Sequence, residues 1–493
     1  MKLLRLKMND NEKIEFDPER WGLPINFVES LGKDLYDIWE RFRDCFSTLT
    51  NNKGENALTY LQGILLMEKG RNYVNISRKV ESPDSDGQNL QNFMSDSPWK
   101  GNAVFDQIQH EVKEDMRLQG GILTLDESGE RRYGDKSAGM GRQYLGVIGK
   151  VDMGQVGVYL GYYAADVWTM VDGELFFPEK WFDENHKQNF KSLHIPEDLK
   201  FRTKPKIGLE LLDKAIANKL PFQCLTCDDL YGRGHNFRKE VDERNITYVA
   251  DVPWDLTVYM EKPETGIPER KGGKGRKPTR WKVLNDAKRT NPRQIAQTLN
   301  LTPVEVRDCE RGKLIYECGM ARVWTITSTG KIRQETLFVR REANGKMTYS
   351  LSNAPKETSI EILAQWRSGR YFAERIFQDS KSELGMDEFE AQKYRAWIHH
   401  TALDALALWF IAQTKLNWKE KHPRDPKLNE QLGIQKLPDL SAANVRLLLQ
   451  TVMPLEKLSL EQAINLVVKH LVNRSKVKKS KSKSTKKRKK APD

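Results

Sequence analysis

The sequence predicts a mixed α/β fold with a helical module before it and a β-rich insertion within it. Three observations support this prediction. Apolar residues recur at helical spacing over the first hundred residues, short apolar runs alternate with amphipathic helices from 121 to 252, and strand-like runs follow between 321 and 352. The chain has 493 residues, of which 38% are hydrophobic. It is therefore long enough for roughly two to four domains with substantial cores.

The positive charge lies mostly at one end of the chain. The 81 Lys and Arg outnumber the 68 Asp and Glu by 13, but 11 of the basic residues fall within 474–490, and residues 1–473 carry only +3. A uniformly basic nucleic-acid coat is therefore excluded. A nearly neutral body with a cationic tail indicates a polyanionic partner, and the tail is predicted to be disordered when free because it holds almost no apolar residues.

Several classes of protein are excluded by composition. No apolar run approaches the ~18 residues needed to span a bilayer, and the N-terminal residues turn acidic too early for a secretory signal. Five cysteines do not make a disulfide framework. We expect a soluble protein of a reducing, intracellular compartment that does not contact a membrane.

The first hundred residues predict helices. Two amphipathic segments are separated by a polar break at 51–56, and further breaks fall at 82–87 and 95–101. The first segment places its apolar residues on one face: Leu31, Leu35, Ile38, Trp39, Phe42 and Phe46. A compact helical module of this size suits binding in a DNA groove, although a module that only packs or dimerises fits the pattern equally well.

Beyond residue 121 the pattern alternates between strands and helices. Apolar runs at 121–126 and 155–164 enclose a glycine-rich basic loop, and an amphipathic helix around 209–216 leads to the apolar run before Asp228. A helix near 235–244 and a strand at 246–252 complete the alternation. This order predicts a mixed α/β core with acidic residues at the ends of its strands.

The sequence pattern changes again between 260 and 358, and the new pattern predicts the β-rich insertion. Three strand-like runs at 321–327, 335–341 and 346–352 follow a loop that suits phosphate contacts. The basic residues of that loop are Arg270, Lys271, Lys274, Arg276, Lys277 and Arg280. Trp324 is a candidate for stacking on a DNA base, with a core position as its alternative. Residues 294–306 also resemble a helix-turn-helix, the other interpretation of this stretch.

Long helical patterns return at 361–383 and 390–414, and a last one covers 440–473. We therefore divide the chain into a helical DNA-binding domain (1–110), the first part of the α/β core (111–259), a β-rich insertion with the basic loop (260–358), the second part of the core (359–420), a C-terminal helical region (421–473) and the basic tail (474–493).

Three acids stand out by position. Asp126 and Asp228 end apolar strands, and Glu374 lies within an amphipathic helix. Cutting or joining phosphodiesters requires an activated oxygen nucleophile and a stabilised leaving oxygen, which carboxylates holding two Mg²⁺ ions about 3.5–4 Å apart supply. Arg370 and Lys381 share the helical face of Glu374 and suit contacts to phosphates, whereas the same pattern in isolation is typical of a solvated, salt-bridged face.

Other groups in the sequence are weaker candidates. Asp229 would point away from Asp228 if the strand continued. Cys224 and Cys227 form a CxxC pair without metal-spaced partners, which makes a zinc site a minor alternative. His399 and His400 are expected to pack or to face DNA. The remaining acids near loops are interpreted as surface charges: Asp135, Asp152 and Asp166.

The motifs occur in a recognisable order. They are LTLDESG (123–129), RQYLGVIGK (142–150), QVGVYLG (155–161), CDDLYGRG (227–234), LSNAP (351–355) and RSGRYFAERIFQDSKSELGMDEFE (367–390). This set, spread over roughly residues 20–420, resembles the DDE transposases of bacterial insertion sequences. Within them it resembles the insertion sequence 701 type, which is related to a larger group with a Tyr-Arg-Glu-Lys signature.

The resemblance assigns roles to individual residues. It implies an RNase H-like core in which Asp126, Asp228 and Glu374 hold two Mg²⁺ ions, with Mn²⁺ as a substitute, and in which a β-rich insertion precedes the Glu. Arg370 and Lys381 reproduce the Arg-x3-Glu-x6-Lys spacing of the signature. The signature Tyr is replaced by Arg367, so the resemblance does not assign a hairpin-forming mechanism to this chain and leaves that step open.

The resemblance also implies a function. The expected activity is cut-and-paste DNA transposition: binding of terminal inverted repeats, cleavage that exposes a 3′-hydroxyl, and transfer of that hydroxyl to target DNA within a homodimeric complex. A bacterial transposase would be cytoplasmic and associated with the nucleoid, and its tail would attract DNA without sequence preference. The alternatives are a domesticated sequence-specific DNA-binding protein with an inactive RNase H-like fold, and an RNase H-like nuclease without strand transfer.

Overall fold

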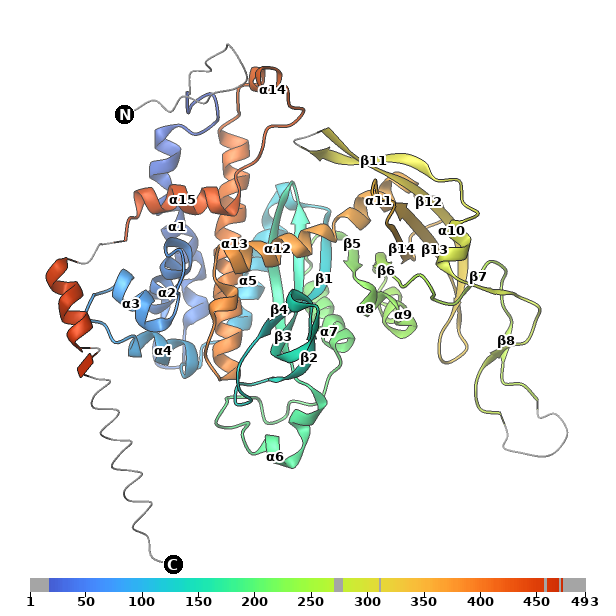
Figure 1. Ribbon diagram of the computed structural model, residues 1–493, viewed down its shortest axis with the longest axis horizontal. Coiled ribbons are helices and arrows are strands. Elements are labelled where there is room, and N and C mark those ends of the chain that lie inside the picture. Colours follow the sequence, from blue (N-terminus) through green and yellow to red (C-terminus); the bar gives the residue numbers. More distant parts are fainter. Residues whose placement is uncertain (1–16, 270–277, 310–311, 456–458, 470, 473–493) are drawn as a thin grey trace, which may run out of the picture.

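The computed structural model describes residues 17–269, 278–309, 312–455, 459–469 and 471–472, and it is a mixed sheet flanked by helices (Figure 1). The α/β class predicted from the sequence is therefore confirmed. The long helix α13 (Tyr394–Lys421) runs between the N-terminal helices and the sheet. It is buried on nearly all sides, because its mostly apolar residues contact the helices on one side and the sheet on the other.

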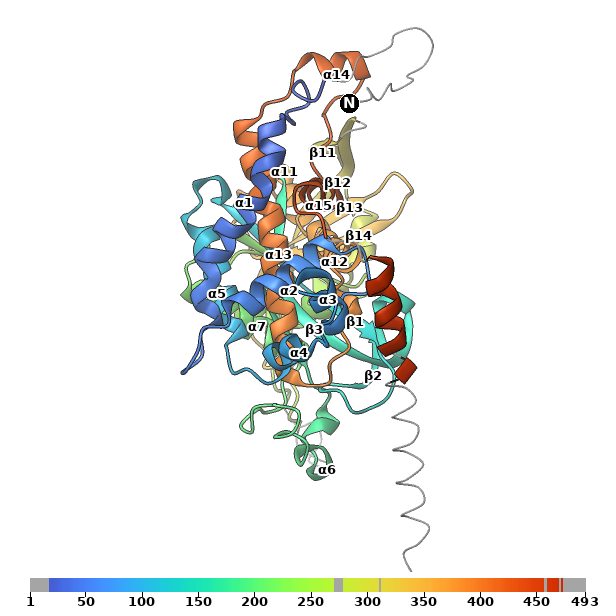
Figure 2. The same cartoon turned by 90° about the vertical axis from the view of Figure 1, so that its left-hand side faces the viewer.

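The N-terminal segment is helical, as predicted. Its elements are α1 (Ile25–Phe42), a 3₁₀ turn (Arg43–Phe46), α2 (Gly54–Leu66), α3 (Tyr73–Val80), α4 (Gln88–Ser95), α5 (Gly101–Glu114) and a second 3₁₀ turn (Met116–Leu118). These helices gather around one side of α13 (Figure 2), where α2, α4 and α5 all contact it. Their apolar side chains belong to the same buried cluster as those of α13 and the sheet, so the helical segment shares its core with the α/β part.

The centre of the sheet combines parallel and antiparallel strands. Its elements are β1 (Gly121–Arg131), β2 (Gly141–Leu145), β3 (Lys150–Ala164), β4 (Val167–Phe176), β5 (Phe222–Cys227) and β6 (Tyr248–Asp251). Strands β1, β5 and β6 run parallel, whereas β3 pairs antiparallel with β1, β2 and β4. The connecting helical elements are 3₁₀ turns (Gly146–Ile148 and Glu179–Phe182), α6 (Glu184–Lys187), α7 (Lys204–Ala217), α8 (Asp229–Gly232) and α9 (His235–Glu243).

The β-rich segment extends this same sheet. Its elements are β7 (Val258–Tyr259), β8 (Thr265–Gly266), β9 (Lys282–Val283), β10 (Arg289–Thr290), α10 (Pro292–Ala296), β11 (Thr302–Cys309), β12 (Gly312–Ile326), β13 (Ile332–Arg341) and β14 (Met347–Ser352). Strand β14 pairs with β6, and β13 and β12 follow outward, whereas β8 and β9 form a separate two-stranded sheet. The three predicted strands are thus present, while the division of 260–358 from the core as an inserted domain stays a prediction.

A buried ion pair fixes the β-rich segment to the core. Glu335 on β13 contacts Arg238 on α9 at 2.8 Å, and neither side chain is exposed to solvent. Tyr248 on β6 and Thr325 on β12 donate their hydroxyls to the same carboxylate. Four groups from separate elements therefore hold β12 and β13 against β6 and α9.

The helix-turn-helix interpretation of 294–306 is wrong. Helix α10 ends at Ala296, and the second expected helix is instead strand β11, paired antiparallel with β12. Val304 and Val306 are buried there, and their alternation with exposed neighbours is the period of a strand.

The C-terminal helices are more broken than the sequence pattern predicts. The elements are α11 (Ile360–Ser368), α12 (Tyr371–Ser382), a 3₁₀ turn (Met386–Glu388), α13, α14 (Lys427–Leu432) and α15 (Ala442–Val452). The helix expected over 361–383 is interrupted at Gly369, where a side chain would clash with Ile122. The helix expected over 440–473 ends before Pro454, and helical structure resumes at 460.

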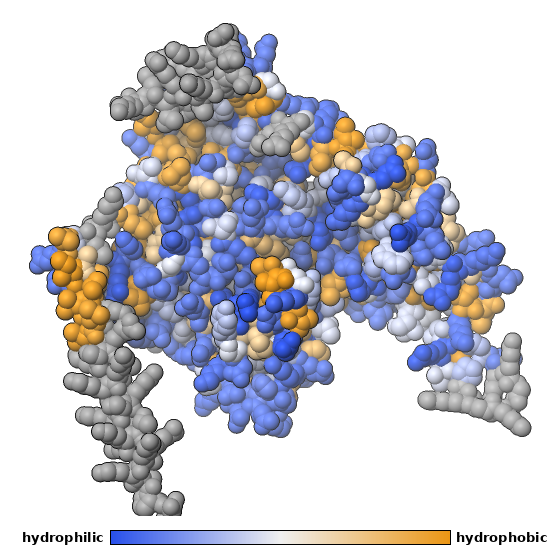
Figure 3. Space-filling model, viewed as in Figure 1, coloured by the Kyte–Doolittle hydropathy of each residue, from blue (hydrophilic) through white to orange (hydrophobic). Residues whose placement is uncertain are grey.

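The helical residues 460–469 lie at the edge of the molecule, where Figure 3 shows an apolar surface. Leu460, Ile464, Val467 and Val468 are at least half exposed there, so this segment adds little to the core. Among the helices of the described residues, none combines the length and apolar composition required to cross a membrane. The basic tail (474–493) lies outside the described residues.

Candidate active site

The register of two parallel strands brings Asp126 and Asp228 together. Leu125 on β1 pairs with Cys227, the last residue of β5, and the residue that follows each of them in the chain is one of these acids. Strand β1 does not end at Asp126, as the sequence predicted, but continues to Arg131 through its pairing with β3. Asp126 therefore marks the end of the parallel pairing rather than the end of the strand, and the juxtaposition with Asp228 is retained.

Glu127 is a third acid at this position, and the sequence analysis missed it. Carboxylate oxygens of Asp126, Glu127 and Asp228 all lie within 4.8 Å of one another. Strand alternation alone would send Glu127 to the face opposite Asp126. Its adjacency to Asp126 in the motif LTLDESG was the only indication available from the sequence.

The surroundings of Glu127 leave part of its carboxylate unsatisfied. Lys204 on α7 contacts Oε1 at 3.2 Å, but Oε2 is buried without a hydrogen-bond partner. The hydroxyl of Tyr231, a fully buried residue of α8, is directed toward Glu127 and likewise lacks a hydrogen bond of standard geometry. Buried polar atoms usually have a partner, so the oxygen of Glu127 that no cation contacts is available to a ligand.

Burial and mutual repulsion raise the pKa values of the two aspartates. For Asp126 burial is the largest cause, Arg370 opposes it, and the charges of Asp228 and Glu127 add to it, which raises the pKa to about 7. For Asp228 burial and the charge of Glu127 raise the pKa to about 6, against the opposing charge of Arg370. The site thus concentrates negative charge that the protein itself compensates only in part.

Arg370 is the cation that faces this group. Burial lowers the pKa of its guanidinium, but the charges of Asp126, Asp251 and Asp228 outweigh that effect and raise the pKa above its usual value. Its closest contacts are Glu374 at 3.2 Å and Asp251 at 3.6 Å. Arg370 therefore links helix α12 to the acid group on the sheet.

Glu374 lies outside the close group of three acids. Its side chain is 61% exposed and pairs with Arg370 across one helical turn. Lys381, two turns further along, is paired with Glu130 on β1, and Phe377 packs edge-on against Tyr159 of β3. The predicted helical face thus contacts the strands that carry the acids, and the role of Glu374 as a third metal ligand stays a prediction.

The residue that replaces the signature Tyr has a clear structural partner. Arg367 forms an ion pair with Asp251 at 2.7 Å, and Ser350 donates a hydrogen bond to the same carboxylate. Asp251 ends β6, the third parallel strand. The charge of Asp251 is compensated by this pair, unlike the charges of Asp126 and Asp228. Because Arg367 lies on α11, the pair also connects that helix to the sheet.

The weaker candidates take structural positions. Asp229 pairs with Arg233 on the surface, and Asp166 pairs with lysines. His399 and His400 are buried, and the burial lowers the pKa of each to about 4, so they are packing residues. Within the part of the chain that the structure describes, no cysteine belongs to a group able to hold a metal, which removes the zinc alternative.

The residues predicted to contact DNA are spread over the β-rich segment. Arg280 is exposed, and Trp324 is half buried with the Lys262 amine 5.7 Å from its ring centre. The remaining predicted contacts of the basic loop lie outside the described residues: Arg270, Lys271, Lys274, Arg276 and Lys277. Their role in DNA binding stays a prediction.

Comparisons with known proteins agree with this geometry. The family described as DDE superfamily endonuclease matches residues 41–313, a range that contains Asp126, Glu127 and Asp228 but ends before α12. The chain is also 26% identical over 309 residues to a protein of Microchaete diplosiphon described as the probable transposase for insertion sequence element IS701. That similarity covers 62% of this chain and 69% of the relative.

Proposed function

The chain belongs to the DDE superfamily of endonucleases, and from that premise we propose that it is a transposase that cuts and joins DNA. Its similarity to the probable transposase of insertion sequence element IS701 supports this choice within the superfamily. The observation that carries the proposal is the group formed by Asp126, Glu127 and Asp228, whose oxygens lie within 4.8 Å of one another with raised aspartate pKa values.

The donor atoms of this group fit a divalent cation. All are carboxylate oxygens, which Mg²⁺ and Mn²⁺ prefer, and Oε2 of Glu127 has no cation paired with it. Asp126, Asp228 and Glu127 would hold the first ion, and Glu374 would complete a second position from α12. When bound, such ions polarise the scissile phosphate and lower the pKa of an attacking water or hydroxyl.

The side chains around the acids supply orientation and compensating charge. Arg370 faces the phosphate side of the group and would neutralise a non-bridging oxygen once DNA displaces part of its pairing with Glu374. Lys204 restrains Glu127, and Lys381 restrains Glu130, so both lysines keep the acidic strand β1 in position. These contacts preorganise the site before the substrate arrives.

The substrate and the assembly follow from the transposase assignment. DNA carrying the terminal inverted repeats would be bound by the N-terminal helices, the β-rich segment and the basic loop. Cleavage would expose a 3′-hydroxyl that then attacks target DNA in a complex of two subunits, each holding one end. We place the protein in the bacterial cytoplasm, associated with the nucleoid.

Two alternative functions share the fold. A domesticated DNA-binding protein would have lost the need for uncompensated carboxylates, so the retained acid group favours an enzyme. An RNase H-like nuclease would use the same group but would not join strands. Strand joining is therefore the step that separates the proposed transposase from a simple nuclease.

The test uses the full chain, Mg²⁺ and a DNA fragment that carries the flanks of its own gene. Wild type is compared with Asp228→Ala and with the control Asp229→Ala, which removes the neighbouring, surface-paired acid. We expect wild type and the control to cleave at the repeat ends and to join those ends to a second DNA. Asp228→Ala should bind the DNA and do neither.

Each of the other outcomes would favour one of the alternative functions or refute the assigned site. Binding without cleavage by wild type would favour the DNA-binding protein, and cleavage without joining would favour the nuclease. Equal cleavage by wild type and Asp228→Ala would refute the assignment of the site.

A further inference from the structure

A cavity of about 530 Å³ lies beside α12, away from the acid group. It is enclosed by the turn before β4, by β11, by one face of α12, by α13 and by the segment that precedes α15. In Figure 1, β11 and this last segment lie above α12. Phe372 and Arg375 of α12 line the cavity, whereas Arg370 of the same helix faces the acids.

The cavity contains a buried lysine without an anionic partner. Lys415 of α13 is only 3% exposed, and its amine lies 3.9 Å from the centre of the Trp168 ring. Over the described ranges, this amine forms no hydrogen bond and no ion pair, and its closest described contact of this kind is the Trp168 ring. A buried charge normally has such a partner, so the position is costly unless a ligand completes it.

Two arginines that line the same cavity also lie over aromatic rings. Arg307 of β11 lies 5.1 Å from the ring centre of Tyr371 and 5.4 Å from that of Phe372, and no described carboxylate pairs with it. Arg375 lies 5.5 Å from the Trp168 ring, donates a hydrogen bond to Gln378 at 2.6 Å and pairs with Asp379 at 3.5 Å. Stacking on rings fixes the direction of a guanidinium while leaving its N–H groups available to an anion.

The acids near the cavity are mostly occupied. Asp166 pairs with Lys436 at 2.8 Å and with Lys419, and Asp439 pairs with Lys419 and Arg424. Asp308 on β11 is exposed at the rim. These acids make their ion pairs with other cations, and Asp439 acts on Lys415 only through its charge, without a direct contact.

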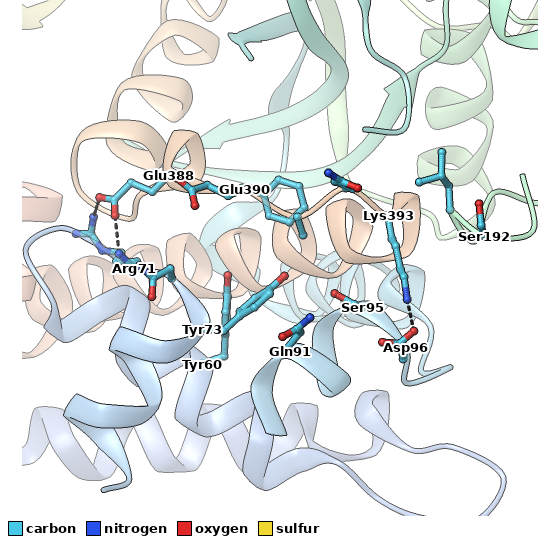
Figure 4. A pocket seen from close by; sticks show the side chains of 15 residues that line it. Tyr60, Arg71, Tyr73, Gln91, Ser95, Asp96, Ser192, Glu388, Glu390 and Lys393 are labelled. Carbon is cyan, nitrogen blue, oxygen red and sulfur yellow. Dashed lines mark hydrogen bonds and ion pairs between the residues drawn. The ribbon is translucent and has the colours of Figure 1, made fainter. Parts of the chain in front are cut away.

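A second cavity, of about 540 Å³, shows the contrasting arrangement (Figure 4). It lies between the N-terminal helices and residues 388–393, and its cations are already paired. Arg71 contacts Glu388 at 2.7 Å, and Lys393 contacts Asp96. That cavity offers no free cation to an anionic ligand, which singles out the one beside α12.

We propose that the cavity lined by Lys415, Arg307 and Arg375 binds a phosphate group of the DNA backbone. This inference rests on the proposed function, because it takes DNA as the substrate. A strand whose scissile phosphate reaches the acids at one face of α12 would place another phosphate at the neighbouring face. Burial lowers the pKa of Lys415 to about 8, against the opposing charges of Asp379 and Asp439, so a phosphate beside the amine would favour its charged form.

The first test measures DNA binding by the full chain in EDTA, so that cleavage plays no part. Lys415→Met and Arg307→Gln are compared with wild type and with Lys393→Met, a lysine that is already paired in the other cavity. We expect Lys415→Met and Arg307→Gln each to weaken binding roughly tenfold at low salt. Each should also reduce the slope of log affinity against log salt by about one, while Lys393→Met leaves the slope unchanged.

The second test reports on the amine itself. An amine-reactive acylating reagent modifies Lys415 in free protein, and mass spectrometry measures how far duplex DNA or inorganic phosphate protects it. Protection by stoichiometric duplex but not by millimolar phosphate supports the proposal. Protection by low phosphate without any effect of DNA would assign the cavity to a free phosphate compound and would overturn it.

The outcomes separate this inference from the proposed function. If wild type binds no DNA, the proposed function fails first. If wild type binds DNA and both cavity variants bind with an unchanged salt slope, only the phosphate site is refuted. Arg307 lies near the surface, so its variant decides the question even if Lys415→Met does not fold.

Discussion

Two sets of buried carboxylates in this protein are treated in opposite ways. Glu335 is fully buried and receives hydrogen bonds from Arg238, Tyr248 and Thr325, and although burial raises its pKa, the charge and hydrogen bonds of Arg238 lower it to about 2. Asp126 and Asp228 lie in a less enclosed position with one shared cation, and their pKa values rise to about 7 and about 6. The negative charge of Glu335 is compensated by side chains of the protein, whereas the charges of Asp126 and Asp228 are compensated only in part and are available to a bound cation.

The difference distinguishes structure from function. A buried carboxylate that stabilises a fold needs its partners built into the chain, because an unpaired buried charge is expensive. A carboxylate that binds a metal must keep its oxygens free, and the fold tolerates the repulsion that results. The difference between compensated and uncompensated acids exists even between neighbouring strands. Asp251 ends β6, next to the strand that leads to Asp228, yet its charge is compensated by Arg367.

The largest expected effect comes from removing a charge at the acid group. Asp126→Asn should reduce DNA cleavage roughly 10³-fold, because metal assistance contributes several kcal/mol and about 1.4 kcal/mol is a factor of ten. The same change should leave the melting temperature of metal-free protein unaltered or higher, since it relieves repulsion with Glu127 and Asp228. Cleavage assays and thermal unfolding in EDTA check both parts, and a large loss of stability would contradict the comparison.

The opposite result is expected at the compensated pair. Arg238→Met leaves Glu335 buried without its cation, so the free energy of unfolding should fall by about 3–5 kcal/mol. Urea unfolding measures this change. The control Arg233→Met breaks the exposed pair with Asp229 and should cost less than about 1 kcal/mol. Equal effects of the two substitutions would show that burial does not govern the outcome.

The sequence predicted the two aspartates of the acid group, but it predicted neither Glu127 nor the buried pair of Arg238 and Glu335. Asp126 and Asp228 were recognisable because each follows an apolar run, and the parallel register places such acids side by side. Glu127 was not, because the period of a strand assigns it to the other face. The pairing of Arg238 with Glu335 was out of reach as well, since 97 residues separate two elements that meet only in the folded sheet.

The prediction of helices and strands from the sequence is limited in the same way, because local pattern does not show tertiary contacts. Helices and strands with a clear period were predicted correctly, including α7, β6 and β13. Errors arose where tertiary contacts override local preference. Strand β11 has a sequence that also suits a helix but is held by pairing with β12, and the helical pattern of 361–383 divides at Gly369, where Ile122 leaves no room for a side chain.

The pH dependence of stability sharpens the comparison at the compensated pair. Because the pKa of Glu335 is lowered from 4.5 to about 2, its ionised form contributes about 3 kcal/mol of stability above pH 4.5, and that contribution is lost as pH falls toward 2. Glu335→Gln should therefore be less stable than wild type at neutral pH, with the difference shrinking on acidification. Urea unfolding at a series of pH values tests this, and a constant difference between pH 6 and pH 3 would count against it.

The smallest expected effect concerns Glu127, and it decides whether this acid belongs with the free set or the compensated set. If its unpartnered Oε2 binds metal, Glu127→Gln should weaken Mn²⁺ or Mg²⁺ binding roughly tenfold, as loss of a supporting ligand typically does. Glu130→Gln is the matched control, because Glu130 lies on the same strand and is paired with Lys381. Calorimetric titration of the metal measures both variants. Unchanged affinity in Glu127→Gln would assign Glu127 to Lys204 alone and leave the metal to Asp126, Asp228 and a residue of α12.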